Sequence, residues 1–432
     1  MNYPDSVHFL YALGNEIKTA KFGLERIRTV MEALGNPQNR LRFVHVAGTN
    51  GKGSTCVMIE SALRAAGQRT GLFTSPHLAE PTERIRISGR PVSAERFASA
   101  FNRVHTAVET LLAAGAIDFH TTYFETVTAM AFLVFADEQA DRVVLEVGLG
   151  GRLDATNIVR PELCVITPVD FDHEAFLGKS LESIAAEKAG ILKRGVPAVF
   201  ARQRTEAARA LDQRAAELEI PVVRTESWAV HDVELNPRGS RFLLSRSGDR
   251  HLSVVCTLAG EHQVENAITA AVALLRLGIP ESAIERGIAS VQWPGRLERV
   301  SERPEIILDG AHNPAAARAV AAYIDRFYRR RRVRLIFGTM RDKSIAEISG
   351  ILFPRAEQVI VTAPRQARAF SPEAIREIAG HPSLSVAPTV EDALERALKA
   401  ASDDDAVLVT GSLFLVAEAR AILVGQVSRL PG

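Results

Sequence analysis

The chain is poor in cysteine, has almost no net charge and contains no long apolar run. Its 3 cysteines in 432 residues, Cys56, Cys164 and Cys256, lie far apart without a C-x-x-C pair. This spacing argues against a disulfide framework or a zinc site and favours a reduced, cytoplasmic location. The formal net charge of +1 gives no reason to expect a nucleic-acid or membrane partner. The longest apolar stretch, VTAMAFLVFA, falls short of the ~18 residues that a membrane span needs, and the N-terminal stretch does not read as a secretory signal.

What the sequence does contain is typical of a globular α/β protein. Hydrophobic residues make up 47% of the chain and charged residues 24%, and 432 residues are too many for one compact core. Continuous runs rich in valine and isoleucine, such as LRFVHVA, DRVVLEVG and ELCVITPV, alternate with helical patterns. Runs of this kind are expected for parallel strands buried on both faces. The order strand, helix, strand therefore predicts an α/β fold.

Two interruptions of this alternation predict how the chain is organised. Residues 222–256 contain RFLLSRSG and HLSVVCTLAG, which favour antiparallel strands in a small side element. Pro294 and Gly295 break the pattern again before alternation restarts at EIILDG. We therefore expect a P-loop-type, mostly parallel sheet domain over residues 1–295 and a smaller Rossmann-like α/β domain over residues 296–432.

The stretch RFVHVAGTNGKGSTC runs from an apolar strand through a glycine-rich turn into a helical pattern. Gly48, Gly51 and Gly53 let the backbone turn tightly, the helix N-terminus supplies free N–H groups, and Lys52 adds a positive charge. These features predict a phosphate cradle. The spacing departs from G-x-x-x-x-G-K-[ST], because Val46 replaces the first glycine and Gly53 separates Lys52 from Ser54. A tight turn that binds nothing remains the alternative.

Two charged residues stand in apolar surroundings. Glu146 lies inside VVLEVG, and a buried carboxylate needs a cation or a hydrogen-bond network, so a magnesium ligand or a structural ion pair is expected. The following EVGLGGRLDATN fails the spacing of a dinucleotide fingerprint, so an NAD site is not expected.

Lys188, in SLESIAAEKAGIL, shares the apolar helix face with Ile184 and Ile191. A desolvated lysine can react with carbon dioxide to give a carbamate, whereas a lysine whose ammonium reaches water is the plainer alternative.

His173 follows the strand LCVIT, at the end of a parallel strand where ligand crevices form. Asp170 and Asp172 stand beside it in the sequence and could orient its ring. His45, inside FVHVA, is most simply a core residue. His173 is therefore the histidine to which we assign a functional role.

Ten stretches in order resemble one family over essentially the whole chain. They are AGTNGKGST, TSPHL, TYFE, LEVGLGGRLDATN, DFDHEAFLGKS, IAAEKAGI, GEHQVENAITA, WPGRLE, DGAHNP and GTMRDKS. The chain resembles the bacterial folylpolyglutamate synthases, often also dihydrofolate synthases, within the ATP-dependent Mur-type ligases. Unlike Mur enzymes, it has GTNGKGST where they have GTNGKTT, and no module for a uridine nucleotide sugar is expected before Arg42. Ser344 in RDKS also departs from the Asp-Lys-Asp that family members often show.

The resemblance implies a reaction and a set of site residues. It implies that ATP converts a folate carboxylate to an acyl phosphate, which the amine of L-glutamate then attacks, with dihydropteroate as a second substrate. It implies ATP contacts by Thr49, Asn50, Gly51, Lys52, Gly53, Ser54, Asn266, Arg296, Asp309 and His312. It implies two Mg²⁺ ions held by Ser75, Glu146, His173 and carbamylated Lys188, with Lys52, His173 and Lys188 as the catalytic group. It implies a pterin site at Lys21, Phe22, Gly23, Thr122, Tyr123, Phe124, Glu125, Leu153, Asp154 and Ala155.

Lys343 and Ser412 lie in loops after strands of the second domain, where they could meet the glutamate carboxylates. The partners expected are therefore small-molecule substrates, with no nucleic acid and no membrane, and the enzyme is expected to be a monomer. A phosphotransferase or ATPase using the same turn is the first rival. A nucleic-acid-binding protein is the second, on the four arginines at 329–332, although cations also suit a helix C-terminus.

Overall fold

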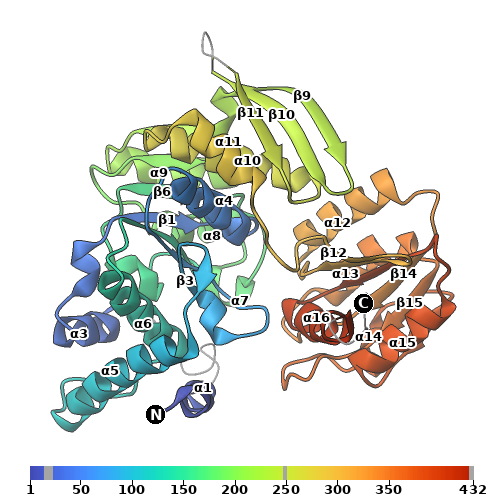
Figure 1. The fold of residues 1–432 in the computed structure, drawn as a ribbon, viewed down its shortest axis with the longest axis horizontal. Coiled ribbons are helices and arrows are strands. Elements are labelled where there is room, and N and C mark those ends of the chain that lie inside the picture. Colours follow the sequence, from blue (N-terminus) through green and yellow to red (C-terminus); the bar gives the residue numbers. More distant parts are fainter. Residues whose placement is uncertain (14–22, 247–250, 428–432) are drawn as a thin grey trace.

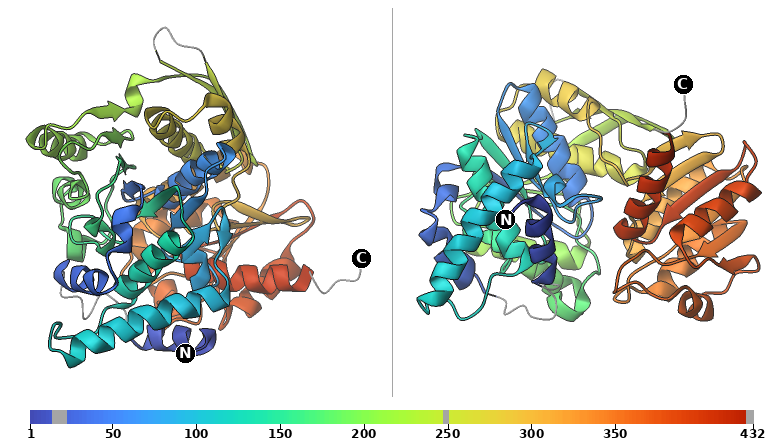
Figure 2. Two further views of the ribbon diagram at one scale, coloured as in Figure 1. Left: turned by 60° about the vertical axis from the view of Figure 1, so that its left-hand side comes forward. Right: turned by 60° about the horizontal axis from the view of Figure 1, so that its bottom comes forward.

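The computed structural model describes residues 1–13, 23–246 and 251–427, which form two α/β units side by side (Figure 1). An eight-stranded sheet forms the first unit and a six-stranded sheet the second, and a three-stranded sheet accompanies the first. In the right-hand view of Figure 2, the second unit (orange to red) stands beside the first (blue to yellow). The predicted fold class is confirmed, whereas the division at residues 295 and 296 stays a prediction.

The eight-stranded sheet has the order β4-β3-β2-β5-β1-β6-β7-β8, and its neighbours are parallel except at the β2–β3 and β3–β4 pairs. Its strands are β1 (Phe43–Ala47), β2 (Thr70–Phe73), β3 (Ile85–Ile87), β4 (Arg90–Pro91), β5 (Arg142–Glu146), β6 (Leu163–Ile166), β7 (Ala198–Phe200) and β8 (Val222–Arg224). Its helices are α1 (Tyr3–Ala12), α3 (Glu25–Ala33), α4 (Lys52–Ala65), α5 (Ala94–Ala113), α6 (Tyr123–Asp137), α7 (Glu174–Leu177), α8 (Leu181–Ala189), α9 (Thr205–Glu217), α10 (Glu261–Arg276) and α11 (Glu281–Ala289).

Alternate residues of each strand enter different cores, because successive side chains point to opposite faces of the sheet. Val44 and Val46 of β1 pack with α4, α10 and α11 on one face. Phe43 of β1 packs with α1, α3, α5 and α6 on the other face. Helices α8 and α9 cover the same face at the β6–β7 end of the sheet. His45 is fully buried in β1 and bonds to Thr156, so it is a core residue as predicted. Burial on both faces explains why the strands are continuous apolar runs.

The three-stranded sheet begins later in the chain than the sequence pattern predicts. It contains β9 (Ala229–Asn236), β10 (Gly239–Ser245) and β11 (Leu252–Cys256), all antiparallel, and packs on the α4–α10–α11 core. We expected the antiparallel element to begin at residue 222. Instead β8 pairs in parallel with β7 and ends the main sheet, which makes 222–224 part of the first sheet. A three-residue strand carries too little periodicity to reveal its sheet.

The six-stranded sheet has the order β12-β13-β17-β14-β15-β16, parallel apart from β12. Its strands are β12 (Glu298–Glu302), β13 (Glu305–Asp309), β14 (Val333–Phe337), β15 (Gln358–Val361), β16 (Leu384–Val386) and β17 (Ala406–Thr410). Helices α12 (Pro314–Phe327), α13 (Ile345–Leu352) and α14 (Pro372–Ile378) cover one face, and α15 (Val390–Ala400) and α16 (Leu413–Val427) the other.

No helix within the described ranges combines the length and apolarity that crossing a bilayer demands. Of the four consecutive arginines, Arg331 pairs with Glu305 and Arg332 with Asp405. These four residues follow the end of α12, as expected for cations near a helix C-terminus.

Candidate functional site

The carboxyl ends of β1, β2, β5 and β6 meet at one edge of the first sheet, and the glycine-rich turn lies there. Gly51, with a φ of 83°, immediately precedes α4, so the turn delivers the helix N-terminus to this edge. A Cβ at Gly51 would lie 2.1 Å from Oδ1 of Asn266, which crosses the turn from α10. Both the backbone conformation and the close approach therefore require glycine at this position.

Lys52 folds back over the turn. Its Nζ donates hydrogen bonds to the carbonyls of Gly48 at 3.2 Å and Thr49 at 3.1 Å. The ammonium therefore stands where a phosphate held by the turn would meet it. Ser54, in the first turn of α4, is buried at the same end of the helix.

Glu146 is the last residue of β5 and is 4% exposed, next to Val46 of β1. Its Oε2 accepts a hydrogen bond from the backbone N–H of Ser75 at 3.0 Å, so two of the predicted metal ligands are in contact. Burial raises the pKa of Glu146, which the charges of Lys52 and Arg296 oppose. A cation beside this carboxylate would remove the cost of burying it.

Lys188, on α8, is 4% exposed and contacts the turn. Its Nζ donates a hydrogen bond of 2.8 Å to the carbonyl of Gly48, which Lys52 also contacts. Burial, with the charge of Lys52, lowers the pKa of Lys188 to about 7. A substantial share of its amine is therefore neutral near neutral pH.

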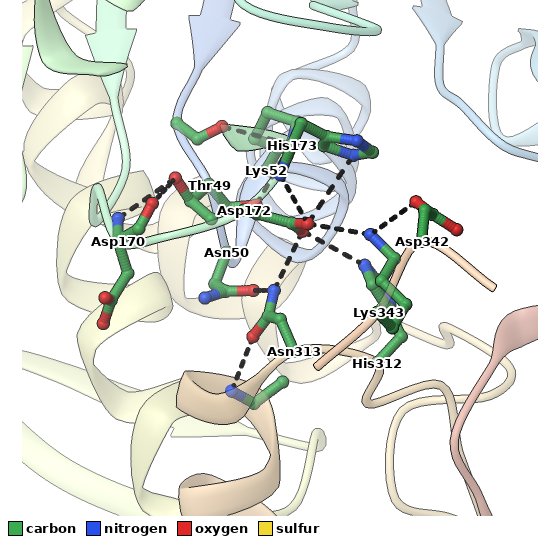
Figure 3. Close-up of polar contacts among 12 residues, drawn as sticks. Thr49, Asn50, Lys52, Asp170, Asp172, His173, His312, Asn313, Asp342 and Lys343 are labelled. Atoms are coloured by element: carbon green, nitrogen blue, oxygen red, sulfur yellow. Dashed lines mark hydrogen bonds and ion pairs between the residues drawn. The ribbon is translucent and has the colours of Figure 1, made fainter. Parts of the chain in front are cut away.

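Asp172 gathers contacts from the second unit, as Figure 3 shows. Its carboxylate accepts hydrogen bonds from Nζ of Lys343 at 2.7 Å and Nδ2 of Asn313 at 3.1 Å, and lies 3.5 Å from Nε2 of His312. Burial alone would raise the pKa of Asp172, but the hydrogen bond and charge of His312, with the charges of His173 and Lys343, hold it well below its usual range. Asp172 is thus an ionised anchor between the two units.

His173 has a left-handed backbone with a φ of 52°, and its N–H donates to Oδ1 of Asp172 at 2.9 Å. Its Nε2 lies 3.9 Å from that carboxylate. Burial lowers the pKa of His173 to about 4, so the ring is neutral near pH 7 and able to act as a ligand. Asp170, which we also expected near this ring, instead faces Arg204 and Arg318.

The remaining residues predicted to contact ATP come from both units. Thr49 and Asn50 reach the β6 side of the turn: the Thr49 hydroxyl donates to the carbonyl of Asp170 at 3.0 Å, and Oδ1 of Asn50 accepts from Asn313 at 3.0 Å. In the second unit, Asp309 ends β13 and accepts from the N–H groups of Leu297 and Ala311, both at 2.9 Å.

Arg296 lies between the units, in a cavity of about 230 Å³ that also contacts Arg86, Trp293 and Arg420. His312 bonds through Nδ1 to the carbonyl of Gly310 at 2.8 Å, which leaves Nε2 to face Asp172. The ring therefore stands against the first unit.

The predicted pterin residues gather around the start of α6. Thr122 and Glu125 form a reciprocal cap, and Oε2 of Glu125 accepts from two guanidinium nitrogens of Arg26, at 2.7 and 2.9 Å. Tyr123 stacks on Tyr11 at 5.8 Å. Gly23 lines a neighbouring cavity of about 340 Å³ together with Arg26. Lys21 and Phe22 lie outside the described residues.

Phe124 and the segment Leu153–Ala155 complete this set. A Cβ at Gly148 would lie 2.5 Å from the Phe124 ring, so glycine there allows the ring to pack. Asp154 is buried and accepts from the N–H groups of Leu149 at 2.9 Å and Thr156 at 3.0 Å. Its carboxylate organises the loop rather than pointing into open space.

The two proposed glutamate contacts have different surroundings. Lys343 is bound to Asp172, as described above, and also lies 3.5 Å from Asp342. Ser412 is 3% exposed and its hydroxyl accepts from the N–H of Leu415 at the start of α16. Local sequence pattern does not predict the Arg26–Glu125 pair or the cross-unit contacts of Asn313, because both depend on segments far apart in the chain.

Comparisons with known proteins agree on one family. The model of the Mur ligase middle domain matches residues 46–274, and that of the Mur ligase glutamate ligase domain matches residues 295–413. A probable bifunctional folylpolyglutamate synthase/dihydropteroate synthase of Halobacterium salinarum is 38% identical over 97% of the chain, which spans about half (51%) of that relative. The dihydrofolate synthase/folylpolyglutamate synthase of Bacillus subtilis is 34% identical, with 93% of this chain and 94% of that protein covered.

Solved structures give the same result. The Mycobacterium tuberculosis folylpolyglutamate synthase complexed with ADP superposes with a TM-score of 0.92 at 32% identity, covering 100% of this chain and 99% of that one. Escherichia coli FolC in complex with DHPP and ADP gives a TM-score of 0.88 at 33% identity, with 98% of each chain covered. The resemblance predicted from the motifs is confirmed.

Proposed function

This chain belongs to the Mur ligase family, among the folylpolyglutamate synthases and dihydrofolate synthases, and we propose that it joins L-glutamate to folates at the expense of ATP. The enzyme is an ATP-dependent ligase that forms an amide bond. Dihydropteroate is a second acceptor, which makes the enzyme bifunctional. The observation that carries the proposal is a group of three ionisable side chains around one glycine-rich turn, the partly buried Lys52 and the buried Glu146 and Lys188.

ATP binds with its phosphates in this turn. The N–H groups at the start of α4 and the Lys52 ammonium face the anion, while Asn266 of α10 lies against the turn at Gly51. Arg296, Asp309 and His312 contact the nucleotide from the side of the second unit. Pro294 and Gly295 act as the hinge between a domain of residues 1–295 and one of residues 296–432, so that closure traps ATP and keeps water from the reacting groups.

The donor set around the turn fits magnesium. Glu146 offers a buried carboxylate with Ser75 beside it, and His173 offers a neutral ring nitrogen. Carboxylate oxygens next to substrate phosphates are what Mg²⁺ prefers. When bound, two Mg²⁺ ions would offset the negative charge of the phosphates. Glu146 and Ser75 hold one ion in this proposal, and His173 with Lys188 holds the other.

Lys188 takes part as a carbamate. Its ammonium first loses a proton to solvent; the neutral amine then attacks carbon dioxide, a C–N bond forms, and a second proton is released, which leaves a carboxylate in place of the cation. The burial of the side chain and its pKa of about 7 both favour this step. A carboxylate at this position would face the turn that Lys188 already contacts through Gly48.

The reaction has two steps. A carboxylate oxygen of the folate attacks the γ-phosphorus of ATP, ADP leaves, and an acyl phosphate results. The amine of glutamate then attacks the acyl carbon, a proton is lost, and inorganic phosphate leaves. Lys52 stabilises charge in the first step through position rather than proton transfer, because phosphoryl transfer depends mostly on positioning and electrostatics.

The acceptor binds near the start of α6. The Arg26–Glu125 pair and the Thr122 cap hold this end of the helix rigid, and Tyr123, Phe124 and Leu153–Ala155 line the approach from the sheet. Lys343 and Ser412 contact the carboxylates of the incoming glutamate. For Lys343 this requires the ammonium to exchange some of its interaction with Asp172.

The test offers purified protein ATP, Mg²⁺ and glutamate with dihydropteroate or tetrahydrofolate in turn, and measures ADP release. We expect release that requires glutamate and occurs with both acceptors. ADP release without glutamate would instead favour a phosphotransferase or an ATPase. ADP release with tetrahydrofolate but not with dihydropteroate would contradict the dihydrofolate synthase activity.

We also propose that the enzyme is a monomer in the cytoplasm. Sedimentation of the purified chain tests its oligomeric state.

A further inference from the structure

A second cluster of ligand-type side chains lies away from the nucleotide turn, on α5 and the segment that follows it. Nδ1 of His105 and Nε2 of His120 each lie 3.8 Å from Oε1 of Glu109. The three atoms all lie within 4.8 Å of one another. Helix α5 runs along the lower left of the molecule in Figure 1, away from the second unit. Nothing in the proposed ligase reaction uses these residues.

The tautomer of His120 is fixed by the backbone. Its Nδ1 lies 3.0 Å from the carbonyl oxygen of Thr121, which can only accept, so Nδ1 carries the proton. Its Nε2 therefore presents a lone pair toward Glu109. Metal-binding histidines usually have this arrangement, with one ring nitrogen donating to a carbonyl and the other free to coordinate.

Both facing nitrogens are buried without a hydrogen bond. Within the described ranges, neither Nδ1 of His105 nor Nε2 of His120 has a hydrogen-bond partner. A buried polar atom without a partner costs free energy. Phe101 stacks on the His105 ring at 5.5 Å and Phe9 packs edge-on at 4.8 Å, so this ring is held against an apolar wall and cannot turn away freely.

The lone pair on Nε2 of His120 faces a carboxylate, and a positive charge between the two would stabilise this arrangement. The cluster consists of one carboxylate and two imidazoles. A divalent cation would satisfy all three facing ligand atoms at once.

We propose that His105, Glu109 and His120 form a binding site for a zinc-type divalent cation. Two imidazoles and one carboxylate are a ligand set that zinc takes, usually with water in a fourth position. Tetrahedral ligands about 2.1 Å from zinc stand roughly 3.4 Å apart, so the observed 3.8 Å separations need only a small closure. Glu109 is 54% exposed and can make that movement, and its exposure gives the ion access.

Occupancy of this site would tie two elements together. His105 and Glu109 lie on α5, whereas His120 lies two residues before Thr122, the cap of α6. The cation thus joins α5 to the segment 114–121 and fixes how the chain enters α6. This consequence is independent of the ligase reaction and can be measured without it.

Zinc affinity is the direct test. Full-length wild-type protein competes with a colorimetric zinc indicator, beside Glu109→Gln, His120→Gln and the control His251→Gln, which changes an exposed histidine just before β11. We expect wild type and His251→Gln to hold one tight zinc ion that Glu109→Gln weakens by about 100-fold. Glu109 is exposed, so this variant leaves the core intact. Equal zinc affinity and stoichiometry in wild type and Glu109→Gln would overturn the proposal.

Two further readouts distinguish this site from the oxygen-rich nucleotide site. Cobalt(II) should give the intense visible absorption of a four-coordinate ion in wild type, and Glu109→Gln should lose that absorption. Zinc should also slow amide exchange in residues 114–121 of wild type but not of His120→Gln. Unchanged cobalt absorption in Glu109→Gln, or no zinc-dependent protection of that segment, would contradict a site at these residues.

Discussion

Buried charged side chains have fewer compensating partners in the first unit than in the second. At the edge of the first sheet, Glu146 and Lys188 are each about as buried as a core residue, and one hydrogen bond reaches each of them within the described ranges. In the second unit, Asp405 accepts from Arg332 at 2.9 Å and Arg334 at 3.1 Å. Glu305 there pairs with two arginines and accepts from a tyrosine hydroxyl at 2.6 Å.

The difference separates reactive charge from structural charge. In the second unit, opposite charges and hydrogen bonds compensate the cost of burying Asp405 and Glu305, so both carboxylates have a structural role. Around the glycine-rich turn the compensation is incomplete, and burial shifts the pKa values of Glu146 and Lys188 toward their neutral forms. Perturbed groups of this kind are typical of catalytic sites. The predictions below test this contrast from its largest expected effect to its smallest.

Replacing the buried lysine should have the largest effect. We expect Lys188→Ala to slow ligation on the order of 10³-fold, the scale of losing a key charge at a phosphoryl-transfer site. The fold should persist, because the substitution removes a poorly compensated buried charge. ADP release and thermal melting are measured together, with and without added bicarbonate. Near-normal ligation in the variant, insensitive to bicarbonate, would refute the carbamate.

Glu146→Ala should weaken the response to magnesium. We expect the Mg²⁺ concentration for half-maximal ATP consumption to rise by about tenfold or more, as for loss of a metal-supporting group. Glu146→Gln is the matched variant, because its amide oxygen can still accept from Ser75 while its charge is absent. A magnesium titration that is unchanged in both variants would remove Glu146 from the ligand set.

The pair formed by Lys343 and Asp172 tests whether the lysine serves glutamate or the contact between units. If Lys343 binds glutamate, Lys343→Ala should raise the KM for glutamate by about tenfold, whereas Asp172→Asn should mainly affect ATP. If the KM values for glutamate and for ATP change alike in both variants, Lys343 serves the contact with Asp172. Initial rates at varied glutamate and at varied ATP make the distinction.

Asp405 should give the smallest effect, and on stability alone. Burial tends to raise its pKa, but hydrogen bonds from Ser402, Arg332 and Arg334 lower it to about 2. A lowered folded-state pKa gives stability that is present above the unfolded value near 3.8 and lost as the pH falls toward 2. Asp405→Asn should therefore melt lower than wild type at pH 7, with a smaller difference at pH 3. A difference independent of pH would contradict this account.

Local pattern was enough to predict much of the fold and part of the site. The strands before Gly48 and through Glu146 are buried runs, and the spacing around Lys188 placed it on the apolar face where the structure has it. These features depend on neighbours close in sequence. The three-residue strand β8 and the Arg26–Glu125 pair depend on partners far along the chain, which no local period encodes.

The roles of the site residues go beyond what pattern could supply. Asp172 was expected to orient His173, but most of its hydrogen bonds and charges come from the second unit, through Lys343, Asn313 and His312. Only the docking of two sheets reveals such a partner. Asp170 was wrongly grouped with it, because adjacent residues in a loop can point in opposite directions.

One amide group links the glycine-rich turn to the second unit directly. Nδ2 of Asn313 lies 3.0 Å from Oδ1 of Asn50 and 3.1 Å from Oδ2 of Asp172, while its Oδ1 caps α12. If the contact of Asn313 with the turn makes phosphate bind more tightly there, bound phosphate must favour the docked arrangement of the two units by the same factor. Truncating the Asn313 side chain should therefore weaken phosphate binding and the docking of the units by the same factor.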